Sequence, residues 1–439
     1  METFLLIAEL VLVFAAILIG VRVGGVGIGA FGAVGTAVLV FVFGEQVGSP
    51  PIDALLIIVA VILTTSAVQA SGGIDAMVAV AARLIVRAPR SITIVAPIVT
   101  FIFSMGAGTS NIAFLLLPVI QEVSERAGIR PSKPISVSVV ATSIALACSP
   151  VSAAMAAMIV IMEGHPGGWP IVQLMLVTVP AALIGVVLTG LIVSRFGGKD
   201  PIDSTGSTER LSISELKSVQ QEVSGRAKAT ALIYLAGVLG IVVFGLLPEL
   251  RPTDTEGERV GVAVMIQLLM FVTAAVVLLV GRPKLDEIPN TAIFQGGMVA
   301  AIAFFGLAWM LDTFLKAHTD TVEATMQQWV SAAPWALAIG IFAVAVLTTS
   351  QSTATRMVVP IGLAAGLPIG LTTGLWVGAL GGIYLLPTNG LQITAANIDS
   401  TGSTKIGTRL YDHSFFVPSL LITVITVVAG AGIGLLVGG

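Results

Sequence analysis

The fold of this chain is decided by residues 91–125, which read SITIVAPIVTFIFSMGAGTSNIAFLLLPVIQEVSE. A small polar tip, Gly106–Asn111, separates two apolar arms of about 15 residues, and each arm would form a helix of roughly 22 Å. A helix of that length is too short for the ~30 Å hydrocarbon core of a bilayer. The segment is therefore predicted to be a re-entrant hairpin, which a membrane tolerates only where other protein covers the broken backbone.

Residues 334–366 repeat this arrangement in the second half of the chain. Their polar tip, Thr348–Thr353, is again flanked by apolar arms. The arm after each tip contains a proline, Pro118 in the first hairpin and Pro360 in the second. The two hairpins therefore form a matched pair.

The composition indicates that the chain is surrounded by lipid. Of its 439 residues, 56% are hydrophobic and 10% are charged, and the mean hydropathy is +1.03, whereas an ordinary soluble domain has roughly 25% charged residues. Apolar runs of about 20 residues, the length that spans a bilayer, recur along the chain. Membrane-spanning helices are expected near residues 4–20, 23–43, 52–71, 134–161, 171–194, 227–248, 260–280, 291–312, 371–396 and 415–437.

Cysteine and histidine are too sparse for disulfides or metal centres. Cys148 is the single cysteine, and His165, His318 and His413 lie far apart in the sequence. We therefore expect no metal, no organic cofactor and no catalytic residues, and Cys148 is interpreted as an inert packed thiol.

A polar stretch, residues 197–226, divides the chain into two similar halves. The first half, 1–196, contains the hairpin 91–125, and the second half, 227–439, contains the hairpin 334–366. Each half has five predicted spans, and an odd number of crossings makes the second half enter the membrane from the opposite side. The expected fold is an all-α polytopic membrane protein of two inverted repeats, each with five transmembrane helices and one re-entrant hairpin.

Lysine and arginine support this topology, because loops that face the cytoplasm carry an excess of both residues. Of the 21 lysines and arginines, 17 fall on the side of the linker 197–226. Three others, Arg251, Arg259 and Lys316, fall on the opposite side, and Arg356 lies within the membrane. The linker is therefore predicted to be cytoplasmic and both termini to face away from the cytoplasm.

Two of the predicted spans contain a proline near their middle, in Cys148-Ser149-Pro150 and in Leu386-Pro387-Thr388-Asn389. Proline removes a backbone donor, and the residue before it avoids the helical region, so each helix should break near mid-membrane. With the two hairpin tips this makes four breaks. Helix ends at such breaks offer N–H groups and positive dipoles to an anion, and carbonyls to a cation. The alternative is a purely structural role, in which the hydroxyls cap helices or join neighbouring ones.

Arg356 indicates the charge of the ligand that the breaks would bind. It lies one turn after the second tip, where an arginine inside a bilayer costs about 2.5–3.5 kcal/mol. Because the two arms of its hairpin contain no Asp or Glu, an anionic substrate is the better partner, and the guanidinium fork suits a carboxylate. The candidate substrate-binding residues are Thr109, Ser110, Asn111, Ser149, Ser350, Ser352, Thr353, Arg356, Thr388 and Asn389.

Four weaker signals are interpreted as follows. Asp312 is either a cation or proton site or an interfacial acid, and Asp399 caps a loop. The string Gly27–Gly32 matches GxGxxG but follows no strand, so it indicates helix packing through small residues. Glu163-Gly164-His165 is interpreted as a solvated outer loop.

At this point the residues resemble a known family, the anaerobic C4-dicarboxylate transporter (Dcu) family of bacterial inner membranes, which lies within a wider ion-transporter superfamily. The resemblance rests on Val23–Gly29, Ile94–Thr100, Ser149–Ala154, Met162–His165, Ala308–Thr313, Leu386–Thr388 and Asp399–Gly407. The family often has Gly at the position of Ser110 and Lys at the position of Arg356. Both departures leave the substrate preference open.

The resemblance implies a transporter of fumarate, malate, aspartate and succinate in a bacterial inner membrane, and not an enzyme. It further implies an exchanger, paired hairpins, a homodimer and an elevator-like moving domain. Uptake coupled to Na⁺ or H⁺ is the alternative, with an anion channel and a membrane enzyme behind it. The expected partners are a dicarboxylate, the lipid bilayer and a second copy of the chain, and no nucleic acid.

Overall fold

The computed structural model describes residues 2–195, 223–253, 257, 259–318, 321, 333–407, 409 and 411–438. Within these residues the regular structure is helical apart from one isolated β-bridge between Thr253 and Arg259. In the first half the helices are α1 (Glu2–Val23), α2 (Gly27–Val38), α3 (Ile52–Ala70), α4 (Gly73–Val86), α5 (Ile92–Ala107), α6 (Asn111–Arg126), α7 (Ser132–Ala147), α8 (Ala153–Glu163) and α9 (Ile171–Arg195). In the second half they are α11 (Gly225–Leu246), α12 (Val262–Gly281), α13 (Ala292–Ala317), α15 (Ala336–Thr348), α16 (Gln351–Ala364), α17 (Ile369–Ala379), α18 (Gly390–Ile398) and α19 (Phe416–Gly438). Shorter helical turns are η1 (Leu39–Phe43), η2 (Pro89–Ser91), η3 (Pro248–Leu250), η4 (Leu285–Asn290) and η5 (Leu380–Tyr384).

Seven of these helices are long and apolar enough to cross a membrane. They are Ile52–Ala70, Pro89–Ala107, Ile171–Arg195, Gly225–Leu246, Val262–Gly281, Ala292–Ala317 and Phe416–Gly438. Six match predicted spans, whereas Pro89–Ala107 contains the first arm of the first hairpin, so length alone does not distinguish that arm from a span. The other four predicted spans correspond to shorter apolar helices. The prediction of an all-α polytopic membrane protein is confirmed.

Both predicted hairpins are pairs of packed helices. The helices α5 and α6 join through the tip 108–110, and α15 and α16 join through the tip 349–350. Both predicted helix breaks are also present: α7 ends at Ala147 before α8 begins, and η5 ends at Tyr384 before α18 begins. Their depth in a bilayer stays a prediction. The predicted linker 197–226 falls almost wholly outside the described residues, so the division of the chain there also stays a prediction.

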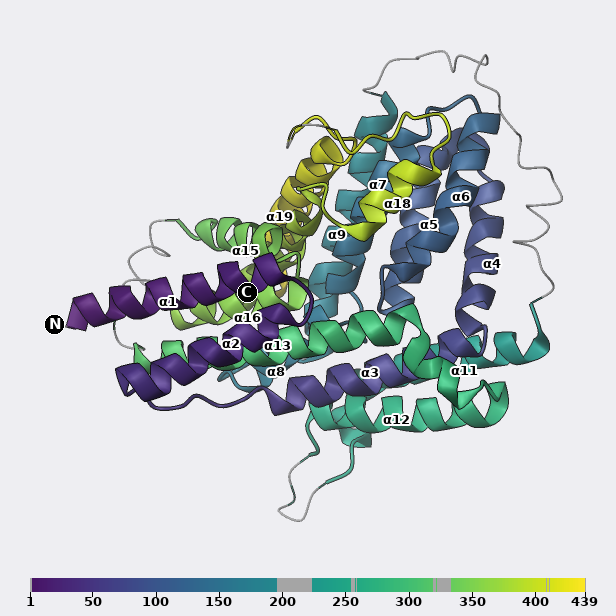
Figure 1. The fold of residues 1–439 in the computed structure, drawn as a ribbon. Helices are drawn as coiled ribbons and strands as arrows, with labels where there is room; N and C mark the ends of the chain where they lie inside the picture. Colours follow the sequence, from purple (N-terminus) through teal and green to yellow (C-terminus); the bar gives the residue numbers. More distant parts are fainter. Residues whose placement is uncertain are drawn as a thin grey trace.

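The helices form two groups that pack mainly within themselves. The frame group consists of α1, α2, α3, α11, α12 and α13, and the hairpin group of α5, α6, α7, α8, α9, α15, α16, α17, α18 and α19. In Figure 1 the helices α5, α6, α7 and α9 run upright, whereas α1, α2, α3, α12 and α13 run across them. Within the hairpin group α6 packs against α18 and α8 against α16. This reciprocal packing of the two halves is what an inverted repeat would produce, although the repeat itself stays a prediction.

The helix α4 was not among the elements expected from the sequence. It follows α3 after Gly72, whose φ of +74° suits glycine. One face of α4 is apolar and buried, with Ile74, Met77 and Ile85, and the helix packs against α5, α6 and α11. At 14 residues it is too short to be detected as a span. It joins the frame group to the hairpin group.

Glycines allow close helix packing inside the frame group. A Cβ atom on Gly306 of α13 would lie 1.9 Å from the carbonyl oxygen of Gly29 on α2, and one on Gly32 would lie 2.6 Å from the backbone of Gly306. Small residues therefore let α2 and α13 touch along their backbones. The interpretation of the GxGxxG string as a packing motif is confirmed.

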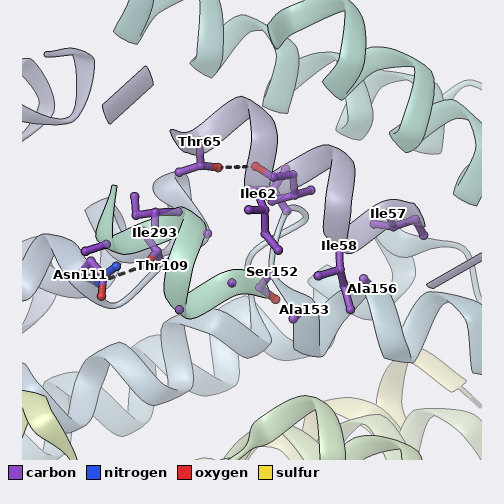
Figure 2. A pocket seen from close by; sticks show the side chains of 16 residues that line it. Ile57, Ile58, Ile62, Thr65, Thr109, Asn111, Ser152, Ala153, Ala156 and Ile293 are labelled. Carbon is purple, nitrogen blue, oxygen red and sulfur yellow. Dashed lines mark hydrogen bonds between the residues drawn. The ribbon is translucent and has the colours of Figure 1, made fainter. Parts of the chain in front are cut away.

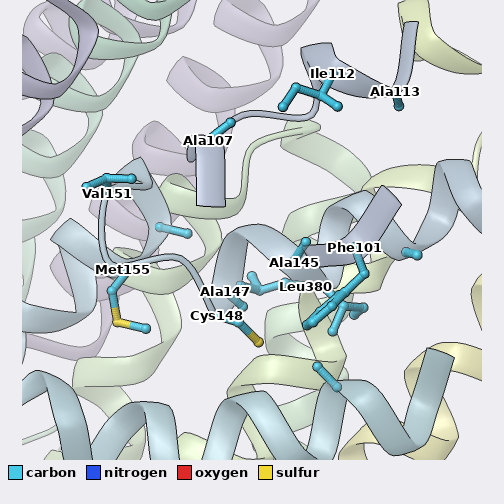
Figure 3. Close-up of a cluster of buried hydrophobic side chains, with 14 of the residues drawn as sticks. Phe101, Ala107, Ile112, Ala113, Ala145, Ala147, Cys148, Val151, Met155 and Leu380 are labelled. Atoms are coloured by element: carbon cyan, nitrogen blue, oxygen red, sulfur yellow. The ribbon is translucent and has the colours of Figure 1, made fainter. Parts of the chain in front are cut away.

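The centre of the hairpin group is fully buried around the first tip and the break after α7. Figure 3 shows Ala107 and Ile112 on the two sides of the tip, with Val151 in the break and Met155 beyond it. Cys148 lies among them and is 0% exposed. Its interpretation as a packed thiol is confirmed.

Candidate functional site

The two hairpin tips turn in the same way with different residues. Gly108 follows α5 and Thr349 follows α15, and both adopt the left-handed conformation, with φ of +67° and +50°. At Gly108 a Cβ atom would lie 2.7 Å from the carbonyl oxygen of Val151, so glycine is required there. Threonine is β-branched, and its presence at position 349 is a conformational strain.

The first tip contacts the middle of the hairpin group. The backbone N–H of Asn111 donates to Oγ1 of Thr109 at 3.2 Å. Ser110 is the residue that immediately precedes α6, and its side chain interacts with the hydroxyl of Tyr384. That hydroxyl also lies 3.0 Å from Oγ1 of Thr142 on α7. The first tip is therefore held against both α7 and η5.

The second tip reaches the adjacent residue of α7. Gln351 donates to the carbonyl of Ser143 at 2.5 Å. Ser350 caps α16, because its hydroxyl accepts from the N–H of Thr353 at 3.3 Å, and it lies 3.4 Å from the hydroxyl of Ser352. Since Thr142 and Ser143 are neighbours, the structure brings both tips to one level of α7.

The two breaks end in capped helices. Ser152 caps α8 by accepting from the N–H of Met155 at 3.0 Å, and it donates to the carbonyl of Leu146. Asn389 caps α18 through a capping box with Gln392. The fully buried Ser149 accepts from the N–H of Val151. Ser152 was not among the site residues predicted from the sequence, although a serine before an apolar run is a known signal for the start of a helix.

Two carbonyls where the break in the second half begins, those of Tyr384 and Leu385, are already engaged. Gln392 and Ser419 both donate to the carbonyl of Tyr384, at 2.9 and 3.1 Å, and the ring of His413 contacts the carbonyl of Leu385 at 2.9 Å. Thr388 is exposed, and its side chain makes no hydrogen bond within the described part of the chain. Each cap engages one N–H group of its helix, and the other first-turn N–H groups and the helix dipole are better suited to a ligand than these two carbonyls.

Four helix N-termini thus belong to one region, those of α6, α8, α16 and α18. Each helix N-terminus carries roughly half a positive charge. Contacts link the four ends: Tyr384 touches the first tip and accepts from Gln392 of α18, while α8 lies beside the first tip and packs against α16. Such an arrangement favours a small anion, and preferably one with two negative charges.

A cavity of about 240 Å³ lies between the two helix groups beside the first tip. Figure 2 shows Thr109 and Asn111 on one side of it, Ser152 of the break on another, and Ile58, Ile62 and Thr65 of α3 opposite. One water occupies about 30 Å³ in the liquid, so the space suits a small organic molecule. Its walls are mainly apolar, with a few hydroxyl and amide groups from the hairpin tip, the break and α3.

Arg356 lies in a different hollow. Its guanidinium carbon is 4.1 Å from the centroid of the Phe304 ring, and its Nε and Nη2 atoms have no hydrogen-bond partner within the described part of the chain. The hollow has no room for water and is completed by Leu307, Ala308, Leu311 and Thr353. Seven residues of α13 separate Gly297, beside the first cavity, from Phe304, which is roughly 10 Å along the helix. Arg356 and the first tip therefore do not share one cavity in this conformation.

One face of α13 lines both hollows. We call it the α13 face. It consists of Ile293, Gly296, Gly297, Phe304, Leu307, Ala308 and Leu311.

Polar contacts between the groups lie elsewhere. Tyr234 of α11 donates to the carbonyl of Ala107 at 2.9 Å. Glu163 of α8 accepts from the N–H of Ala263 on α12 at 3.1 Å. Burial of this carboxylate over α12 raises the pKa of Glu163, partly offset by the backbone N–H groups of Ala263 and Val262. Glu163 is exposed, as the interpretation of a solvated outer loop expected, but it also caps a helix of the other group, which the sequence did not indicate.

The two aspartates have structural roles. Asp399 accepts from the backbone and hydroxyl of Thr401, from the hydroxyl of Ser403 and from the N–H of Thr404, which confirms that it caps a loop. Asp312 accepts from the N–H of Ser49 at 2.6 Å and pairs with Lys316 at 3.0 Å. The structure favours the interpretation of Asp312 as an interfacial acid.

The fold is shared with two solved structures. The chain aligns with MtrF of Neisseria gonorrhoeae, one of a class of antimetabolite efflux pumps, with a TM-score of 0.58 and 12% identity over 92% of this chain and 84% of that one. It aligns with the YdaH transporter of Alcanivorax borkumensis with a TM-score of 0.53 and 12% identity over 94% and 97% of the two chains. These likenesses concern the fold alone.

The fold and the whole-chain comparisons define a polytopic membrane transporter, not an enzyme. The helix N-termini and the half-buried arginine are the parts of it that suit a ligand. The chain belongs to the anaerobic C4-dicarboxylate membrane transporter family, whose sequence profile matches residues 5–438. The resemblance noted from the sequence is confirmed.

Relatives in this family match nearly the full chain. The C4-dicarboxylate transporter DcuA of Escherichia coli (strain K12) is 34% identical over 435 residues, which are 98% of this chain and 99% of that protein. DcuA of Wolinella succinogenes is 34% identical over 97% of this chain and 98% of its own length. The anaerobic C4-dicarboxylate transporter DcuB of Escherichia coli O157:H7 is 30% identical over 96% and 97% of the two chains.

Proposed function

We propose that this protein transports C4-dicarboxylates such as fumarate, malate, aspartate and succinate, and that it does so by exchange. The relatives DcuA and DcuB are named as C4-dicarboxylate transporters. The observation that carries the proposal for this chain is the half-buried guanidinium of Arg356, whose Nε and Nη2 atoms are buried and have no hydrogen-bond partner within the described residues. A positive group in that position is best neutralised by an anion.

In the proposed site the two carboxylates of the substrate are held by the two hairpins. The first tip, with Thr109, Ser110 and Asn111, binds one carboxylate through hydroxyl, amide and backbone donors. The second tip, with Ser350, Ser352 and Thr353, binds the other together with Arg356. Ser149, Thr388 and Asn389 line the remaining wall. Because Arg356 and the first tip face separate hollows here, Arg356 must leave its hollow to complete the site.

Exchange follows from the charge of the site. An empty site carries the arginine and four helix N-termini, and moving that charge through a low-dielectric region is costly. A bound dianion offsets the charge. The loaded site therefore moves between the two sides of the membrane more readily than the empty site, so inward and outward transport become coupled.

Coupling to Na⁺ or H⁺ is the alternative mode. The carbonyls at the break after η5 accept hydrogen bonds from Gln392 and Ser419 and contact His413, which supports an anion over a cation at that break. Accumulation of succinate under an imposed Na⁺ or H⁺ gradient, with no substrate inside the vesicles, would instead establish symport. Steady conductance in a bilayer recording would establish a channel.

We further propose a location in the bacterial inner membrane, as a homodimer with both termini outside the cytoplasm. The segregation of lysine and arginine to the side of the linker 197–226 supports this orientation. Single cysteines introduced near the two termini and in the linker test it. In intact cells an impermeant thiol reagent should label only the terminal positions.

The central experiment is counterflow of labelled succinate in proteoliposomes. We expect the wild type to take up labelled succinate against unlabelled internal succinate, and Arg356→Gln to lose this activity because the site loses its cation. Arg356→Lys is the matched control, since it keeps the charge, and it should retain part of the activity. Full counterflow by a well-folded Arg356→Gln protein would remove Arg356 from the site. Absence of counterflow by the wild type would refute the proposed function.

A further inference from the structure

The partner of Arg356 in this conformation is an aromatic ring. Phe304 is 1% exposed, and its ring lies 4.1 Å from the guanidinium carbon. A guanidinium over an aromatic face is attracted by the ring quadrupole, most strongly where water is excluded. The hollow around the pair has no room for water. The ring side of the contact is therefore closed to water, although Arg356 itself is only half-buried.

The charged groups nearby leave Arg356 without an ion pair. Asp312 of α13 acts on it at longer range, but the Asp312 carboxylate is bonded to Ser49 and Lys316. The other neighbours in the hollow are Leu307, Ala308, Leu311 and Thr353, none of which carries a charge. The guanidinium of Arg356 therefore rests on the ring, and its Nε and Nη2 donors are unused within the described residues.

This contact crosses the boundary between the two helix groups. Arg356 belongs to α16 of the hairpin group, and Phe304 belongs to α13 of the frame group. Any movement of one group past the other must break the contact. Any carboxylate that binds Arg356 at the second tip must also draw the guanidinium away from the ring.

We propose that Phe304 is a positioning residue that holds Arg356 while the site is empty and yields it to the substrate. The ring and the substrate carboxylate compete for one cation. In the empty transporter the contact between Arg356 and Phe304 holds the hairpin group to α13, and substrate binding breaks this contact. This inference rests on the proposed function and adds to it a physical reason for exchange, because the empty form is held back by an attraction as well as by its charge.

Phe304→Leu tests the competition. Losing the ring removes the attraction that the substrate must overcome, so the KM for succinate in counterflow should fall by roughly two- to thirtyfold. Efflux of labelled succinate into medium without substrate should rise relative to exchange, because the empty site now returns more freely. Phe304→Tyr keeps the ring, so the KM for succinate and the ratio of efflux to exchange should both stay at their wild-type values. Phe305→Leu, one position along, where the ring packs at a tilt against Trp309, is the matched control and should change neither.

A role in packing alone gives a different result. Phe304→Leu would then lower the amount of folded protein or the maximal rate, with KM and the efflux-to-exchange ratio at wild-type values, and the inference would be overturned. If Phe304→Leu does not accumulate, Phe304→Met replaces the ring by a flexible side chain that fills irregular space, and it gives the same reading. Equal behaviour of the Met and Tyr variants would also overturn the inference.

A measurement without transport separates this inference from the proposed function. Melting temperatures in detergent, without substrate, are compared for Phe304→Leu, Arg356→Gln and the double variant. If the ring holds the guanidinium, the double variant loses less than the sum of the two single losses. Strict additivity would refute the contact even where succinate counterflow is intact. Conversely, a coupled pair in a protein that fails to exchange succinate would leave the contact standing and refute the function.

Discussion

Relaxing the strain at the second hairpin tip should stabilise the protein. Thr349 has a φ of +50°, and the left-handed conformation costs an L-residue about 1–2 kcal/mol. Asparagine adopts this conformation more easily, and glycine adopts it freely. Thr349 is exposed, so its replacement removes little packing.

The magnitude follows from two opposing terms. Thr349→Gly recovers about 1–2 kcal/mol of strain and loses about 0.5–1 kcal/mol to the greater freedom of glycine in the unfolded chain. The net gain in unfolding free energy is about 0.5–1 kcal/mol, and Thr349→Asn should reach about 1 kcal/mol. In a chain of 439 residues that corresponds to a rise in melting temperature of about 1–2 °C.

The assay is thermal unfolding of purified protein in detergent, followed by tryptophan fluorescence. Gly108→Ala at the equivalent position of the first tip is the matched control. It combines a φ of +67° with a Cβ atom 2.7 Å from the Val151 carbonyl, so it should destabilise by about 2 kcal/mol or more. A lower melting temperature for both Thr349 variants would refute the reasoning, since it would mean that the threonine side chain is a net stabilising contact. Counterflow on the same preparations shows whether the strain serves transport, in which case relaxing it slows exchange.

Three further changes have defined outcomes. Gly306→Ala places a methyl 1.9 Å from the Gly29 carbonyl oxygen. The free energy of unfolding should fall by about 1–3 kcal/mol or more, which thermal unfolding would show as a lower melting temperature. Glu163→Ala removes the cap on α12 and should cost about 1 kcal/mol, whereas Glu163→Gln keeps an acceptor and should cost less. Because the pKa of Glu163 is raised, the carboxylate's contribution to stability declines as pH rises from 4.5 through the raised value, and melting curves of Glu163→Gln should lack this pH dependence. Tyr384→Phe removes the hydroxyl that joins Thr142 to the first tip, so KM for succinate should rise while stability falls by only about 1 kcal/mol.

The hairpins and breaks could be predicted because their signals are local. Proline at positions 150 and 387 and the polar tips at 106–111 and 348–353 interrupt apolar runs at fixed spacing, and each interruption acts through its own backbone. The glycine pattern of Gly27–Gly32 was also informative, since small residues at helical spacing allow close packing. The capping box of Asn389 and Gln392 follows a known local pattern and could have been predicted.

The remaining features depend on contacts between distant segments. Glu163 caps α12 a hundred residues away, and Arg356 rests on Phe304 of α13, so neither partner leaves a trace in the neighbouring sequence. The helix α4 was missed because its apolar face packs against α5, α6 and α11, and the helix is too short to be predicted as a membrane span. Tyr384 and Gln351 were missed for the same reason, since their partners Thr142 and Ser143 lie on another helix.

The α13 face has a consequence for the speed of transport. Its side chains, from Ile293 to Leu311, carry no hydrogen-bonding group, so a shift of the hairpin group along it breaks no hydrogen bond on that surface. One helical turn is about 5.4 Å, and such a shift breaks the contact between Arg356 and Phe304, whereas the other side chains of the face meet only apolar groups. Once that contact is broken, the resistance to movement at this surface is governed by side-chain volume, for example at Ala308. A bulkier residue at that position should slow the turnover rate and leave substrate affinity unchanged.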